Sequence, residues 1–202
     1  MKIYIDFDGT LFDSSQYYSN YTNIFKKHNI NINEILNKTY EKDKNFDTIS
    51  KKLIKEYNLN QNIYEELNTM YKKNYIFKDV IPFLEKYSQK YELILLTLGN
   101  INYQKKKIKN SKISKYFKDI IITDKDKSNL NIDYKNGIFI DNNPLELKKF
   151  YNSKVKYLIR IKRNTDKYSK LNMDIENIPE FTNFNELMKS NYIDKIGDEI
   201  NE

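Results

Sequence analysis

The most informative segment of the sequence lies near its start and reads Ile3-Tyr4-Ile5-Asp6-Phe7-Asp8-Gly9-Thr10-Leu11. Its apolar residues predict a strand that ends at Asp6, and Asp8 follows two positions later on the same side of the chain. Gly9 then permits a turn that a residue with a Cβ would resist. Two carboxylates this close repel each other unless a positive charge lies between them, and Mg2+ with oxygen ligands is the usual solution. These residues indicate a cation-dependent acidic site, and the alternative is an ordinary strand that ends in an acidic turn.

The sequence after Leu11 shows helical rather than strand periodicity as far as residue 75. Four helices are expected there, over residues 15–28, 33–42, 47–57 and 60–75. Ser15 is the expected N-cap of the first helix. Together the helices predict an α-helical bundle inserted after the first strand. The chain would then divide into an inserted unit of residues 15–75 and a core of residues 1–14 plus 76–202.

From residue 79 onward, apolar strands alternate with helices. Strands are expected over residues 93–97, 120–123, 137–141 and 155–161. Helices are expected over residues 79–90, 103–110 and 145–150, with a last helix capped by Asn183 or Asn185. This alternation predicts an α/β protein with a Rossmann-like parallel sheet covered on both faces. In such sheets, ligands bind beyond the carboxyl ends of the strands.

Polar side chains do follow the predicted strands. Those at or just after a strand end are Asp6, Asp8, Thr97, Lys125, Lys127 and Asp141. A buried strand that ends in a hydroxyl is common, so Thr97 alone would carry little weight. The joint arrangement predicts one site to which several strands contribute.

Composition restricts the class of protein. The chain has 202 residues, of which 39% are hydrophobic and 31% charged, so a soluble domain with an insertion is expected. It has no Cys, which excludes disulfides, thiolate zinc sites and cysteine nucleophiles. No apolar run of about 18 residues indicates a membrane span. Residues 1–12 hold two Asp and do not fit a cleaved signal peptide, so a cytoplasmic location without membrane contact is expected.

The formal net charge of +7 favours anionic substrates by raising their local concentration. Lysine is spread over the whole chain together with Asn, Ile and Tyr, so nucleic acid is not the favoured partner, although the charge does not exclude it. The lysine-rich run over residues 103–118 is interpreted as a solvated helix face. No feature of the sequence indicates an oligomeric state.

In order and spacing, the residues at the strand ends resemble the four motifs of the haloacid dehalogenase (HAD) superfamily. The matching segments are Asp6-Phe7-Asp8-Gly9-Thr10-Leu11, Leu95-Leu96-Thr97-Leu98-Gly99-Asn100, Lys125 or Lys127, and Ile140-Asp141-Asn142-Asn143-Pro144. The resemblance covers roughly residues 1–160. The helical insertion stands where the family carries its C1 cap.

By this resemblance Asp6 is the nucleophile, which takes the phosphoryl group as an aspartyl phosphate. Asp8 would protonate the leaving oxygen and then deprotonate the attacking water. Mg2+ would be the cofactor, held by Asp6, Asp141 and Asp8, the last through its backbone carbonyl as in the family. The acid at position 8 favours phosphate chemistry over C–halogen cleavage, because a halide leaving group needs no proton.

The resemblance also implies contacts to the substrate. Thr97 would hold a phosphoryl oxygen, and a lysine would neutralise charge on the transferred group. Lys127 is preferred for that role, because Asp126-Lys127-Ser128 resembles the third motif of deoxyribonucleotidase-like members; Lys125 is the alternative. The other implied substrate-binding residues are Gly9, Thr10, Leu98, Gly99 and Asn100.

The fourth motif departs from the family at Asn142, where a second acid is usual. Either Asp141 alone suffices, or Glu146 supplies the other carboxylate, as in members whose acids are several residues apart. The charge missing at Asn142 predicts weaker binding of Mg2+.

The resemblance thus implies a Mg2+-dependent phosphomonoester hydrolase, with a small phosphorylated metabolite such as a nucleotide or sugar phosphate as substrate. One alternative is a phosphatase of phosphorylated nucleic-acid ends, which the basic charge would suit. The other is a catalytically degenerate HAD-fold binding or regulatory protein, which Asn142 and Asn143 would suit.

Overall fold

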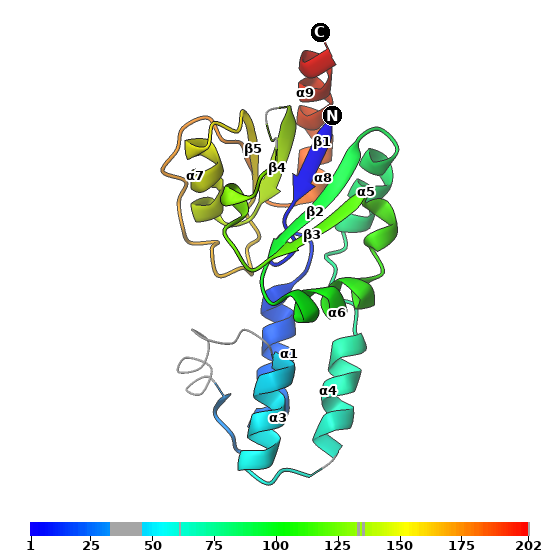
Figure 1. The fold of residues 1–202 in the computed structure, drawn as a ribbon, viewed down its shortest axis with the longest axis vertical. Coiled ribbons are helices and arrows are strands. Elements are labelled where there is room, and N and C mark those ends of the chain that lie inside the picture. Colours follow the sequence, from blue (N-terminus) through cyan, green and yellow to red (C-terminus); the bar gives the residue numbers. More distant parts are fainter. Residues whose placement is uncertain (33–45, 61, 133, 135, 202) are drawn as a thin grey trace.

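The computed structural model describes residues 1–32, 46–60, 62–132, 134 and 136–201. Its six strands form a parallel sheet in the order β3-β2-β1-β4-β5-β6 (Figure 1). The strands are β1 (Lys2–Ile5), β2 (Glu92–Leu98), β3 (Asp119–Thr123), β4 (Gly137–Asp141), β5 (Tyr157–Ile161) and β6 (Glu180–Phe181). The α/β parallel sheet predicted from the sequence is confirmed, and the short strand β6 is an addition to it.

Strand β1 lies at the centre of the sheet. Lys2 pairs in register with Glu92 of β2 on one side and with Gly137 of β4 on the other. The side chains of β1 alternate between two buried layers, with Ile3 packed on one face of the sheet and Tyr4 on the other. Because all the strands are parallel, their carboxyl ends meet at one edge of the sheet.

Helices cover both faces of the sheet. One face carries α5 (Val80–Ser88), α6 (Ile101–Ser111), α8 (Phe184–Lys189) and α9 (Tyr192–Asn201), and the other carries α7 (Pro144–Asn152). Asn183 is the N-cap of α8, where its side chain accepts a hydrogen bond from the backbone N–H of Glu186. This settles the choice that the sequence left between Asn183 and Asn185. Helix α9 was not predicted.

Among the described residues, three further helices lie beyond the edge of the sheet at which the strands end (Figure 1). They are α1 (Ser14–Lys26), α3 (Phe46–Glu56) and α4 (Asn62–Lys72), and the helix expected over residues 33–42 falls outside the described residues. Ser15 was wrongly expected to cap α1. Asp13 does so by accepting a hydrogen bond from the backbone N–H of Gln16, while the Ser15 hydroxyl donates to the carbonyl of Thr165.

The chain enters and leaves this helical region through two adjacent segments. The backbone N–H of Asp13 donates to the carbonyl of Tyr75 at 2.7 Å, and that of Phe77 donates to the carbonyl of Leu11 at 3.1 Å. Phe12 and Ile76 form an antiparallel bridge between them. The predicted division into an inserted unit of residues 15–75 and a core of residues 1–14 plus 76–202 stays a prediction. None of the described helices is long and apolar enough to cross a membrane.

Candidate active site

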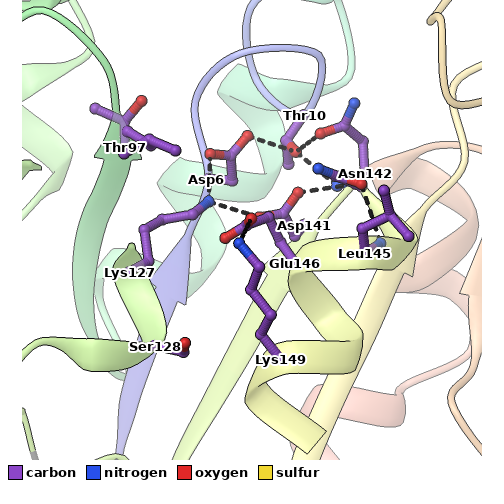
Figure 2. Close-up of polar contacts among 12 residues, drawn as sticks. Asp6, Thr10, Thr97, Lys127, Ser128, Asp141, Asn142, Leu145, Glu146 and Lys149 are labelled. Atoms are coloured by element: carbon purple, nitrogen blue, oxygen red, sulfur yellow. Dashed lines mark hydrogen bonds and ion pairs between the residues drawn. The ribbon is translucent and has the colours of Figure 1, made fainter. Parts of the chain in front are cut away.

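Asp6, Lys127 and Asp141 form the buried centre of the site (Figure 2). The Lys127 Nζ atom lies 2.9 Å from Asp6 Oδ1 and 2.7 Å from Asp141 Oδ2. Asp6 directly follows β1 and Asp141 ends β4, so the pairing of these two strands brings the carboxylates together. Lys127 begins a short 3-10 helix whose N-cap is Asp126, and this turn directs the lysine inward.

The charges of this cluster do not balance. Burial raises the pKa of Asp6 to about 7, with a further contribution from the charge of Asp141 and opposition from Lys127. Burial also raises the pKa of Asp141. Burial would lower the pKa of Lys127, but the two carboxylates raise it above its ordinary value. Lys127 therefore stays positively charged and is shared by two carboxylates. With both carboxylates ionised, the cluster carries a net negative charge that a further cation could neutralise.

Lys125, the alternative to Lys127, does not reach this cluster. Its side chain is exposed, and its backbone N–H donates to the hydroxyl of Thr123. The two lysines are two residues apart, but only Lys127 lies in the turn capped by Asp126. The structure thus places Lys127 beside Asp6 and leaves Lys125 at the surface.

Asp8 lies in a separate set of contacts. Its carboxylate pairs with the buried ammonium group of Lys107, accepts from Gln104 Nε2 at 2.6 Å, and accepts from the Ser14 hydroxyl at 2.8 Å. Burial would raise the pKa of Asp8, but Lys107, Gln104 and Ser14 together hold it below its ordinary value. The carboxylate is therefore ionised near neutral pH.

Lys107 and Gln104 were missed by sequence reasoning, which assigned the lysine-rich run to a solvated face. Both lie on the buried side of α6, together with Tyr103, Ile108 and Ser111. These five positions follow helical periodicity, so the spacing contained the signal. The charge of Lys107 concealed it, because a lysine is seldom buried unless it is paired.

Thr97 and the residues after it shape the second strand end. Thr97 is buried, and its hydroxyl and the carbonyl of Leu98 each accept from Gln104 Nε2 at 3.1 Å. Gly99 has a φ of +153°, and a Cβ there would lie 3.0 Å from Gln104 Nε2. The Asn100 side chain caps α6 by accepting from the backbone N–H of Tyr103. Gln104 therefore links the Thr97 strand end to Asp8.

The turn after Asp8 requires glycine. Gly9 has a φ of +84°, and a Cβ there would lie 2.3 Å from Asn142 Nδ2. The Thr10 hydroxyl, fully buried, contacts Asp6 Oδ2 at 3.2 Å and the backbone N–H of Asn142 at 3.0 Å. The first and fourth strand ends are thus joined through Thr10 and Asn142.

The donor groups near Asp141 suit a magnesium ion. Glu146 is buried on α7; its Oε1 accepts from Lys149 at 2.7 Å, whereas its Oε2 is buried without a hydrogen-bond partner in the described part of the chain. Within that part, no group of three or more His, Cys, Asp or Glu side chains forms a ready-made metal site. Mg2+, however, usually binds through one or two carboxylates plus waters and substrate phosphate. Asp6 and Asp141 supply two such carboxylates, so the residues fit this ion.

No protein-family model matches the sequence, and no curated protein matches it either. A haloacid dehalogenase-like protein from Burkholderia xenovorans LB400 matches with a TM-score of 0.72 at 10% identity, over 93% of this chain and 94% of that chain. YfnB from Bacillus subtilis, a HAD-type protein solved bound to magnesium, gives 0.59 at 15% identity, over 94% and 97%. The L-2-haloacid dehalogenase from Xanthobacter autotrophicus gives 0.54 at 12% identity, over 83% and 79%. The chain therefore has the fold of the haloacid dehalogenase superfamily.

Proposed function

We propose that this protein is a Mg2+-dependent hydrolase of small phosphomonoesters. The observation that carries the proposal is the buried cluster in which Lys127 lies between Asp6 and Asp141. A phosphoryl group brings negative charge to a nucleophile, and Lys127 supplies positive charge beside it. Mg2+, held by Asp6 and Asp141, would supply further neutralisation of the phosphoryl oxygens.

The two proposed steps use the two acids differently. Asp6 attacks phosphorus, the bond to the ester oxygen breaks, and that oxygen takes a proton from Asp8 as the alcohol leaves. Asp8 then removes a proton from water, which attacks the aspartyl phosphate and releases phosphate and free Asp6. The Asp8 carboxylate paired with Lys107 is in the form that the second step needs. The first step needs the Asp8 carboxyl group to be protonated. Protonation removes its charge and therefore breaks its ion pair with Lys107.

The acid at position 8 favours phosphate ester hydrolysis over dehalogenation. A halide leaves without a proton, so a dehalogenase gains nothing from a proton donor beside the leaving group. Asp8 supplies an acid at this position, and its contacts with Lys107, Gln104 and Ser14 fix where the carboxylate lies while they favour its ionised form. We therefore propose a phosphate ester as the substrate, although the Xanthobacter dehalogenase shares the fold.

Hydrolysis of p-nitrophenyl phosphate tests the proposal. Purified protein should release phosphate with Mg2+ and stop doing so in EDTA, and Asp6→Asn should be inactive although folded. Lys125→Met, which changes an exposed lysine, is the matched control and should retain activity. Activity that survives thorough chelation would reject the metal. A lack of phosphate release from a panel of nucleotides and sugar phosphates would favour the binding-protein alternative.

A further inference from the structure

A buried acid outside the four motif-like segments reaches the site. Asp166 lies in the connection between β5 and β6, and 9% of its surface is exposed. Its Oδ2 atom accepts hydrogen bonds from Asn142 Nδ2 and, at 3.2 Å, from the backbone N–H of Tyr168. Its Oδ1 atom lies 3.2 Å from the position that a Cβ on Gly9 would occupy. Asp166 is therefore packed behind the side chain of Asn142.

Asp166 determines which way the Asn142 amide points. A carboxylate only accepts hydrogen bonds, so the amide nitrogen faces Asp166 and the amide oxygen faces Thr10. Thr10 Oγ1 lies 3.1 Å from Asn142 Oδ1 and 3.2 Å from Asp6 Oδ2. It also accepts from the backbone N–H of Asn142. The single hydroxyl hydrogen of Thr10 thus has two acceptors, the amide of Asn142 and the carboxylate of Asp6.

The opposite amide orientation would change the hydrogen bonding of Asp6. The amide oxygen would then face Asp166, which places two acceptors in contact, and the amide nitrogen would face Thr10. The Thr10 hydrogen would be left with Asp6 as its acceptor. A full hydrogen bond stabilises the ionised carboxylate and makes it a weaker nucleophile.

We propose that Asp166 is a positioning residue of the active site, which acts on Asp6 through Asn142 and Thr10. By fixing the amide of Asn142 it gives the Thr10 hydrogen a second acceptor and leaves Asp6 Oδ2 available for attack. The inference rests on the proposed function, because it takes Asp6 as the nucleophile. Under this proposal, the acid in contact with Asn142 comes from Asp166, in the connection between β5 and β6.

Exchange of the two side chains tests the contact. With Mg2+ saturating for every variant, Asn142→Asp alone puts two carboxylates against each other, and kcat should fall about 10- to 100-fold, the usual cost of losing a group that orients an active-site residue. The double variant Asn142→Asp/Asp166→Asn restores one donor and one acceptor at the same contact, so kcat should return close to that of the wild type. KM for p-nitrophenyl phosphate should change little in either protein. A double variant as slow as Asn142→Asp would overturn the proposal.

A double-mutant cycle of Asp166 and Thr10 tests whether the effect of Asp166 on kcat passes through Thr10. Asp166→Ala should lower kcat in the wild type but cause little further loss in Thr10→Val, where the shared hydroxyl is absent. A purely structural role for Asp166 would give the same fold-loss in both backgrounds, and this outcome would overturn the positioning role. Thermal unfolding of each variant confirms that the assays are done on folded protein.

Failure of the proposed function gives a different result. If the wild type hydrolyses no phosphate ester, that function is wrong, and unfolding still reports on the contact. Asn142→Asp should then lower the midpoint of unfolding, and the exchanged double variant should recover it. No recovery there would reject the contact itself.

Discussion

At the residue scale, Lys127 shares its one positive charge between two buried carboxylates. Lys127 lowers the pKa of Asp6, but burial and the charge of Asp141 outweigh it and raise that pKa to about 7. At pH values between the ordinary pKa of an aspartate and about 7, Asp6 is protonated in the folded protein but ionised in the unfolded chain. The folded state then binds more protons, so its stability falls as the pH rises through that window.

Asp6→Asn should therefore stabilise the protein while it abolishes turnover. The amide cannot ionise, so the variant escapes the loss of stability that Asp6 causes as the pH rises to about 7 and above. Urea unfolding in EDTA, at acidic and mildly alkaline pH, measures the difference. We expect a more stable variant above neutrality and convergence with the wild type near the ordinary pKa of aspartate. A variant less stable than the wild type at alkaline pH would contradict this charge balance.

Lys127→Met should have the opposite effect on stability. It leaves two buried carboxylates without their cation, and breaking a buried ion pair from one side costs about 3–5 kcal/mol. The loss should shrink in acid, where both carboxylates hold protons. Denaturant unfolding of Lys127→Met and of Lys125→Met gives the comparison, since the exposed control should stay within about 0.5 kcal/mol of wild type. Equal losses in the two variants would refute the buried pair.

At the element scale, α6 shows where the sequence was informative and where it was not. Lys105 and Lys109 are exposed, as a solvated helix face predicts, but Lys107 is buried between them. Helical geometry places residue 107 on the same side as Tyr103, and pairing with Asp8 makes the burial tolerable. Local periodicity predicts the position of a side chain, whereas its partner comes from a distant strand end.

Lys107→Met should destabilise the protein at neutral pH and much less in acid. The folded pKa of Asp8 lies below its ordinary value, so its stabilising contact is complete above the ordinary pKa and is lost as the pH falls through the folded one. Thermal unfolding at neutral and acidic pH measures the effect. Lys105→Met, an exposed lysine of the same helix, is the control. A pH-independent loss would mean that Lys107 contributes packing alone.

In other elements too, local sequence patterns were predictable and contacts between distant segments were not. Strand β4 was predicted with its observed bounds, because Gly137–Asp141 is an apolar run that the sheet buries on both faces. Strand β6 has two residues, too few for a recognisable alternation. Helix α9 did carry a signal, since Ile193, Ile196 and Ile200 have helical spacing. Asp166 had none, because its position depends on how a long connection folds back onto Asn142.

At the scale of the whole molecule, α6 connects the sheet to the helical region. The Tyr103 hydroxyl donates to that of Tyr17 in α1 at 2.6 Å, and Lys106 pairs with Asp47 of α3 at 2.8 Å. The helices α1, α3 and α4 therefore lie on the side of the molecule that carries the strand ends (Figure 1). Under the proposed function, this placement favours compact substrates over polymers.

Intact protein should therefore hydrolyse a mononucleotide at least as well as a phosphorylated oligonucleotide. The net charge of +7 should raise the rate for both at low ionic strength, with a modest dependence on salt. Rates on the two substrates at low and moderate salt give the comparison. A strong preference for the oligonucleotide that collapses as salt rises would indicate counterion release from bound nucleic acid. That result would replace the substrate class without changing the proposed mechanism.

The central position of β1 has a consequence for the order of events on the ribosome. Lys2 pairs with Glu92 and Gly137, so both neighbours of this strand are translated after the entire helical region. Translation proceeds at about 5–20 residues per second, so β1 is present for several seconds before either neighbouring strand is made. During that time both of its edges can pair with other segments. The helical region, whose contacts are more local, has time to fold first. Asp6 is thus translated long before the residues that complete its surroundings, and a chain truncated before β4 would contain Asp6 without Asp141 and the rest of the cluster.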